Sequence, residues 1–238
     1  MTSRRRAGTL AAVVLFALIA GMSPAFAAST PSGNWHAVRI VEKKASVAGT
    51  TIAWAELGSG PTLLLLNGTA SPMNEWDPAF LAGLAHSNRV VVLDYPGLGD
   101  SGAAPGPWAF DRAADWMADF IAQVSPGAPV NVLGWSMGGF IAQQLAIRHP
   151  DRVHALVLAG TNPGGSKAVL GPAWVQQIDS NETSDWDYLR TNYPASGIPA
   201  GRRFLARLDA AVTSGRYPEV DTPQTTLEAM VAAEDPWL

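Results

Sequence analysis

Residues 134–138, with the sequence GWSMG, form the pattern in this chain that is best suited to chemistry. A short apolar run over residues 130–133 precedes them, and a helical pattern begins at Met137. Glycine at both flanks suits a turn too tight for side chains, and such a turn pushes the Ser136 hydroxyl out at the end of a strand. Free N–H groups at the following helix N-terminus favour developing negative charge. The pattern predicts a nucleophilic serine; the alternative is an ordinary glycine-rich loop between a strand and a helix.

A serine hydroxyl needs a general base, so the four histidines of the chain are the next residues to test. His149 follows Ser136 along one expected helix and should lie roughly 20 Å from it at about 1.5 Å per residue. His86 and His154 are expected at the opposite edge of the sheet, and His36 in an N-terminal strand outside the loop face. None of the four is expected to act as the base, and surface or helix-end positions explain them.

Other side chains expected near the nucleophile each have two interpretations, one functional and one structural. Asp94 and Asp100 should lie on the same face as the nucleophile, but shaping the Pro-Gly turn between them explains both better than catalysis does. Tyr95 and Trp135 would either line a pocket or pack in the core. The chain has no cysteine and no closely spaced histidine pair, which excludes disulfides and a cysteine nucleophile and argues against a metal site. No cofactor is expected.

The elements that must position Ser136 alternate between apolar strands and amphipathic helices. This order is typical of a mostly parallel sheet wound on both faces by helices, with an antiparallel pair at one edge. From residue 166 onwards the strand pattern stops and four amphipathic stretches follow, over residues 172–178, 184–193, 201–214 and 222–234. Strands are expected over residues 35–44, 51–57, 62–66, 89–93, 130–133 and 153–160, and helices over 77–86, 111–124 and 137–148.

The first 27 residues have the pattern of a signal peptide. Three arginines at positions 4–6 precede an apolar run over residues 10–22, and Ala25-Phe26-Ala27 fits a cleavage site. The alternative is an uncleaved N-terminal anchor, and the general and twin-arginine export routes both stay open. Cleavage after Ala27 would remove the three arginines and change the net charge from −4 to −7. Such a protein is expected to be secreted or periplasmic, with no nucleic-acid partner and no stable membrane association.

Four segments, in this order, resemble the α/β-hydrolase superfamily over about residues 36–238. They are the apolar strand running into Asn67-Gly68, DYPGLGDS at residues 94–101, GWSMGG at 134–139 and AIRHPDRVHALVLAG at 146–160. The resemblance implies an α/β-hydrolase fold, a serine nucleophile at Ser136, a histidine base and an acid. It also implies an oxyanion hole formed by the Met137 N–H and by the Thr69 N–H, with the Ala70 N–H as the alternative donor.

The resemblance also predicts the domain organisation. After the leader at 1–27, residues 28–165 would form the hydrolase core and residues 166–238 an incomplete helical lid. The acid and the histidine of the family follow two further strands that are not in this sequence, and those would add about 40–60 residues. The chain therefore resembles a copy truncated within the lid.

Two functions follow from that resemblance. The first is an exported serine hydrolase for a small ester, amide or similar substrate, inactive as written because the histidine and the acid are absent. The second is a truncated or degenerate non-enzyme that binds a small molecule or a partner. A protein completed by a partner or assisted by a metal is a third, less favoured interpretation.

Overall fold

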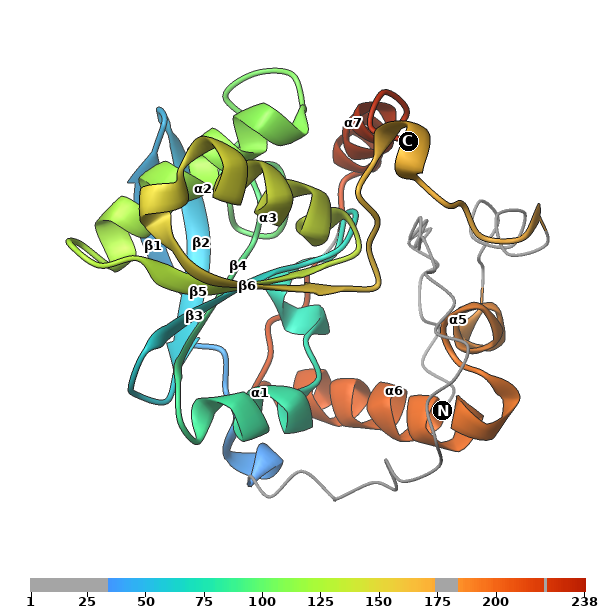
Figure 1. Cartoon of the computed structure of the whole chain (residues 1–238). Coiled ribbons are helices and arrows are strands. Elements are labelled where there is room, and N and C mark those ends of the chain that lie inside the picture. Colours follow the sequence, from blue (N-terminus) through green and yellow to red (C-terminus); the bar gives the residue numbers. More distant parts are fainter. Residues whose placement is uncertain (1–33, 174–183, 221) are drawn as a thin grey trace.

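A six-stranded sheet forms the centre of the molecule (Figure 1). The computed structural model describes residues 34–173, 184–220 and 222–238, so the expected leader at 1–27 lies outside the described residues. The strand order is β1-β2-β4-β3-β5-β6, with β1, β2 and β4 joined antiparallel and β4, β3, β5 and β6 joined parallel. The strands are β1 (Lys43–Val47), β2 (Thr50–Leu57), β3 (Thr62–Leu66), β4 (Arg89–Leu93), β5 (Val130–Trp135) and β6 (Val153–Ala159).

Helices cover both faces of this sheet and bury two apolar clusters against it. On one face lie α2 (Phe110–Val124) and α3 (Met137–Arg148), and on the other lies α1 (Pro78–Ala85) (Figure 1). The central strands β3 and β4 are continuous apolar runs because side chains on both of their faces are buried. The mostly parallel sheet with helices on both faces that the sequence predicts is therefore present in the described residues, with the antiparallel pair at the edge.

The first expected strand, over residues 35–44, is wrong. Residues 35–37 form a short 3-10 helix, η1 (Trp35–Ala37), and β1 begins only at Lys43. The apolar side chains of Val38 and Ile40 are buried, but the Ile40 N–H donates to the Arg216 carbonyl at 2.9 Å instead of joining the sheet. This stretch has an alternating pattern because it packs beside the C-terminal helices.

We define residues 166–238 as the C-terminal segment, and its described residues form three further α-helices. They are α5 (Asp185–Asn192), α6 (Ile198–Thr213) and α7 (Gln224–Glu234), and they confirm three of the four expected stretches. The fourth, over residues 172–178, lies mostly outside the described residues. The Arg207 guanidinium on α6 forms an ion pair with Asp77, the N-cap of α1, and thereby ties α6 to the core.

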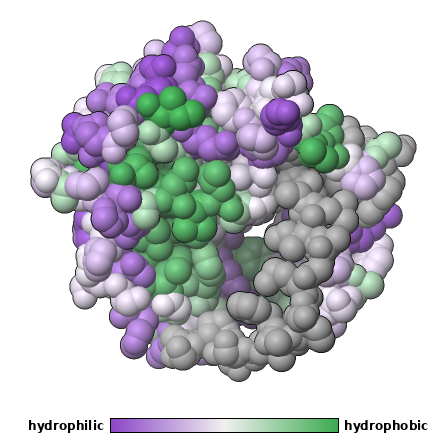
Figure 2. Space-filling view, in the orientation of Figure 1, coloured by the Kyte–Doolittle hydropathy of each residue, from purple (hydrophilic) through white to green (hydrophobic). Residues whose placement is uncertain are grey.

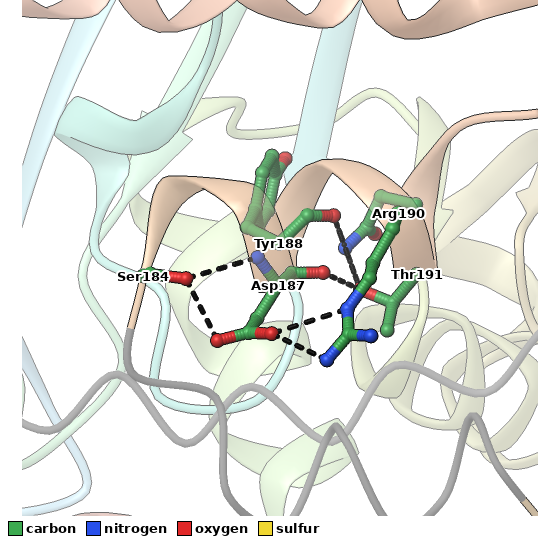
Figure 3. A network of polar contacts seen from close by, with 6 residues as sticks. Ser184, Asp187, Tyr188, Arg190 and Thr191 are labelled. Carbon is green, nitrogen blue, oxygen red and sulfur yellow. Dashed lines mark hydrogen bonds and ion pairs between the residues drawn. The ribbon is translucent and has the colours of Figure 1, made fainter. Parts of the chain in front are cut away.

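Helix α5 has a well-formed N-terminus, shown in Figure 3. The Ser184 hydroxyl accepts a hydrogen bond from the Asp187 N–H and donates one to the Asp187 carboxylate, which also accepts hydrogen bonds from Arg190 (Figure 3). This cap satisfies the Asp187 N–H, one of the groups that the first turn of a helix leaves without intrahelical acceptors. No helix in the described ranges is long and apolar enough to cross a membrane.

Strand β6 lies at the edge of the sheet and carries exposed apolar side chains. Leu156, Val157 and Leu158 are 36%, 52% and 44% exposed, and Figure 2 shows an apolar area in the region of β6. Among the described strands, β6 is the last in the sheet, and an apolar edge strand invites pairing with other chains.

A charge placed on this edge should therefore reduce self-association. We expect protein starting at residue 28 to associate as its concentration rises, and Val157→Lys to shift its mass in light scattering towards the monomer. Ile147→Lys is the matched control, because Ile147 is an exposed apolar residue on α3 and not on the sheet edge. A wild-type protein that is monomeric at every concentration, or an equal effect of the two substitutions, would contradict this expectation.

Candidate active site

Ser136 lies at the turn between β5 and α3 with a strained backbone. Its φ of 53° and ψ of −124° are rarely adopted by residues other than glycine, and such a conformation costs on the order of 1–3 kcal/mol. The Ser136 N–H donates to the Ala159 carbonyl of β6 at 3.0 Å, which ties the turn to the neighbouring strand. The sparsely populated backbone angles expected for this residue are confirmed.

The glycines on both sides of Ser136 allow this turn because no side chain would fit there. A Cβ on Gly134 would lie 2.5 Å from the Gly138 carbonyl oxygen, and a Cβ on Gly138 would lie 2.1 Å from the Leu66 carbonyl oxygen. The start of α3 therefore packs directly on the end of β3. This close approach brings the loop that follows β3 beside the nucleophile.

The loop after β3, residues 67–70, is shaped by Asn67. The Asn67 side chain accepts a hydrogen bond from the Gly68 N–H and donates one to the Pro72 carbonyl, and the Tyr95 hydroxyl donates to the Asn67 carbonyl at 3.0 Å. Asn67 and Tyr95 are both buried, so these side chains organise the loop. Tyr95 thus belongs to the core instead of lining a pocket.

The same loop lies against Ser136. A Cβ placed on Gly68 would lie 3.4 Å from the Ser136 Cβ and 2.8 Å from the Trp135 ring. The Met137 N–H is the first of α3 and has no intrahelical acceptor, and Thr69 directly follows Gly68. The Ala70 N–H, by contrast, donates to the Met230 sulfur at 3.2 Å. Of the two expected alternatives, the Thr69 N–H is therefore the better candidate for the second oxyanion donor, and that role stays a prediction.

Aromatic side chains form one wall beside this loop. The Trp135 ring packs next to Gly68, and its centroid lies 6.5 Å from that of Trp76, which in turn stacks on Phe80 at 5.8 Å. Trp76 is buried, whereas Trp135 is half-buried. The surroundings of Ser136 on this side are apolar.

All four histidines lie away from Ser136, as expected. His149 is the residue that ends α3, thirteen positions after Ser136, and its ring contacts Asp115 at 2.6 Å. His154 follows Val153, which pairs with the start of β5, whereas Ser136 follows the end of β5. His86 ends α1 at the edge of the sheet where β4 begins, and His36 lies in η1.

The buried carboxyl groups near the loops have structural contacts. The Asp94 carboxylate accepts a hydrogen bond from the Met73 N–H at 2.6 Å, and the Asp94 carbonyl accepts one from the Ser101 hydroxyl, so its expected role in shaping the turn fits the structure. Burial raises the pKa of Asp94 to about 6. Because the folded state favours the neutral acid, this group's contribution to stability is full below about pH 4 and is lost as the pH rises through about 6.

Sequence reasoning missed Glu234, which belongs to the same neighbourhood. The Glu234 side chain is 3% exposed, and its Oε1 accepts a hydrogen bond from the Thr69 hydroxyl at 2.5 Å. A signal was available, because Leu227, Met230 and Glu234 share the helical spacing of one apolar face. A carboxyl group on such a face is expected to have a specific partner.

Within the described residues, no cluster of three or more His, Cys, Asp or Glu side chains could hold a metal ion. The site thus consists of a strained serine, a loop with backbone donors, an aromatic wall and a buried carboxyl group. Comparison with known proteins identifies the family of the chain. A sequence profile described as "alpha/beta hydrolase fold" matches residues 61–202, more than half of the chain.

The chain belongs to the α/β-hydrolase fold family. It is 34% identical over 113 residues to a pimeloyl-[acyl-carrier protein] methyl ester esterase from Aeromonas hydrophila subsp. hydrophila, covering 48% of this chain and 42% of the relative. A protein of the same name from Nitrosomonas europaea is 31% identical over 187 residues, covering 74% of this chain and 71% of the relative. The chain thus spans less than half the length of the first of these relatives.

Solved structures agree with this fold. An alpha/beta hydrolase fold protein from Chitinophaga pinensis aligns with a TM-score of 0.65 at 22% identity, covering 83% of this chain and 72% of that protein. At this identity the likeness concerns the fold alone. The α/β-hydrolase fold inferred from the sequence is confirmed.

The close approach of α3 to β3 generates a stability prediction. Gly138→Ala would force a Cβ against a backbone oxygen, so we expect it to lower the free energy of unfolding by about 2 kcal/mol or more, in the range of overpacked sites. Gly83→Ala is the matched control, because Gly83 is an exposed residue within α1 and nothing lies within 4 Å of an added Cβ. The control should stabilise the protein by about 0.5–1 kcal/mol. Chemical denaturation measures the free energy of unfolding of both variants. Equal changes in the two variants would contradict the close approach of α3 to β3.

Proposed function

We propose that this protein is a hydrolase of small carboxylic esters in which Ser136 is the nucleophile. The observation that carries the proposal is the strained backbone of Ser136 at the strand-to-helix turn, with the loop of residues 67–70 packed against it. A residue other than glycine is held in such a conformation only where the surroundings enforce it, and such strain gathers at active sites. The ester chemistry named for the two esterase relatives supports the same substrate class.

The residues suit the steps of acyl transfer as follows. The Ser136 oxygen attacks the carbonyl carbon of the ester, a bond forms between them, and the carbonyl electrons move to its oxygen. The Met137 and Thr69 N–H groups donate hydrogen bonds to this oxyanion, and each such donor contributes a few kcal/mol to the transition state, about 2.7–4 in a measured case. The carbonyl then re-forms as the ester C–O bond breaks, and the leaving oxygen departs as an alcohol with the proton that the Ser136 hydroxyl gave up. Water next attacks the acyl carbon, the bond from this carbon to Ser136 Oγ breaks, and the acid leaves while one water proton returns to Oγ. The wall of Trp135, Trp76 and Phe80 favours an apolar acyl group.

The second candidate function is binding without efficient turnover. All four histidines belong to the described residues and lie away from Ser136, so no histidine is available to take the serine proton. A serine without a base keeps an ordinary alcohol pKa. The oxyanion hole and substrate binding alone leave a reaction rate only about 10³–10⁴-fold above that in water. We therefore propose that the 238-residue chain alone turns ester over slowly.

Reaction with a fluorophosphonate distinguishes these outcomes. We expect slow but complete labelling of the 238-residue chain, loss of labelling in Ser136→Ala, and p-nitrophenyl acetate hydrolysis near background. Ser101→Ala is the control, since Ser101 is a second serine that hydrogen-bonds within a turn and should label no faster or slower. Rapid turnover that Ser136→Ala abolishes would mean that a histidine or another group does act as the base. Unchanged labelling of Ser136→Ala would refute the nucleophile.

We also propose that the protein is exported and cleaved after Ala27. The support is the sequence pattern of a basic start, an apolar run and a small-residue cleavage site over residues 1–27. The expected result is a mature N-terminus at Ala28 in protein recovered from outside the cytoplasm, measured by N-terminal sequencing. Recovery of the chain in the membrane fraction with its N-terminus at Met1 or Thr2 would contradict cleavage and favour an anchor.

A further inference from the structure

Helix α7 makes two polar contacts with the loop of residues 67–70, and the segment just before α7 makes a third, although these parts of the chain are far apart in the sequence. Glu234 accepts a hydrogen bond from the Thr69 hydroxyl at 2.5 Å, and the Met230 sulfur accepts one from the Ala70 N–H at 3.2 Å. Thr222, just before α7, donates its hydroxyl hydrogen to the Ala70 carbonyl at 2.9 Å. The loop is therefore fixed from the side of α7 at two successive residues.

These contacts occupy the backbone groups of Ala70. Ala70 has a φ of 54°, a second strained residue in the site, and both its N–H and its carbonyl are bonded to the α7 side. The N–H and the carbonyl of Ala70 are thus both already engaged on the α7 side. The neighbouring Thr69 N–H is left to serve the oxyanion, and the Thr69 side chain is the group that Glu234 holds.

Burying a carboxyl group at this position lowers the free energy of unfolding unless a specific hydrogen bond offsets the loss. Glu234 is buried, and burial raises its pKa to about 7. A buried apolar residue of similar size would avoid that cost, because carboxyl groups are rarely buried without a specific partner. Thr69 is such a partner, and it lies in the loop that packs on Ser136.

We propose that Glu234 is a positioning residue that keeps the Thr69 N–H directed at the oxyanion through its hydrogen bond to the Thr69 side chain. This inference rests on the proposed function of Ser136 and Thr69. Helix α7 is then a part of the catalytic apparatus and not only a cover. Because the contact acts on the orientation of a donor, its loss should slow the chemical step and leave the binding of a ligand unchanged.

The test measures inactivation of the whole chain by a fluorophosphonate, whose phosphoryl oxygen also occupies the oxyanion position. Glu234→Ala and Thr69→Val should each lower the maximal inactivation rate by about tenfold, the worth of one hydrogen bond, with the half-saturating concentration within about twofold. The double variant should be no slower than either single variant, because both remove one interaction. Glu234→Gln and Thr69→Ser, which keep the hydrogen bond, should restore most of the rate.

Glu228→Ala is the matched control, since Glu228 is exposed on the same helix and bonded to Gln224. An inactivation rate of Glu234→Ala within about twofold of the wild type, at a temperature where both are folded, would overturn the inference. Independent, multiplying effects of the two single variants would overturn it as well. Labelling that persists in Ser136→Ala would instead refute the proposed function, so the two failures can be told apart.

A second measurement applies if labelling is too slow to resolve. The NMR order parameter of the Thr69 amide should fall from about 0.85 in the wild type to below about 0.6 in Glu234→Ala, while that of Glu228→Ala stays unchanged. An unchanged Thr69 order parameter would overturn the inference without any appeal to activity.

Discussion

The structure depends on one steric constraint, the close approach of α3 to the carbonyl oxygen of Leu66 at Gly138. A Cβ there would lie 2.1 Å from this oxygen, so only glycine permits the contact. The contact fixes the turn between β5 and α3, and the turn holds Ser136 at a φ of 53°. The same contact brings the loop after β3 against Ser136. The nucleophile and the candidate oxyanion donors are thus positioned by one packing contact, between the start of α3 and the end of β3.

Buried polar groups then fix the loops that the sheet brings together. Asn67 organises its own loop, Asp94 accepts a hydrogen bond from the Met73 N–H, and Glu234 reaches Thr69 from α7. Burial raises the pKa of Asp94 to about 6 and that of Glu234 to about 7, so each carboxyl group is costly to keep charged in the folded protein. Both hydrogen-bond to the chain around the site, which indicates that local geometry is favoured there over maximal stability.

Local sequence patterns predicted most of the fold. Continuous apolar runs located β3, β4 and β5, and the flanking glycines located the turn at Ser136, because these features depend on neighbouring residues alone. The strand expected over residues 35–44 was wrong because Val38 and Ile40 alternate for packing next to the C-terminal segment. Glu234 was missed because its partner Thr69 is 165 residues away, and only the fold brings such residues together.

The most direct test of the account is a crystal structure of the protein after reaction with a fluorophosphonate. The account predicts a phosphorus atom bonded to Ser136 Oγ, with the phosphoryl oxygen about 2.7–3.1 Å from both the Met137 and the Thr69 nitrogen atoms. Glu234 should still accept the hydrogen bond of the Thr69 hydroxyl in that structure. An adduct on another residue, or a phosphoryl oxygen directed away from these two nitrogen atoms, would contradict it.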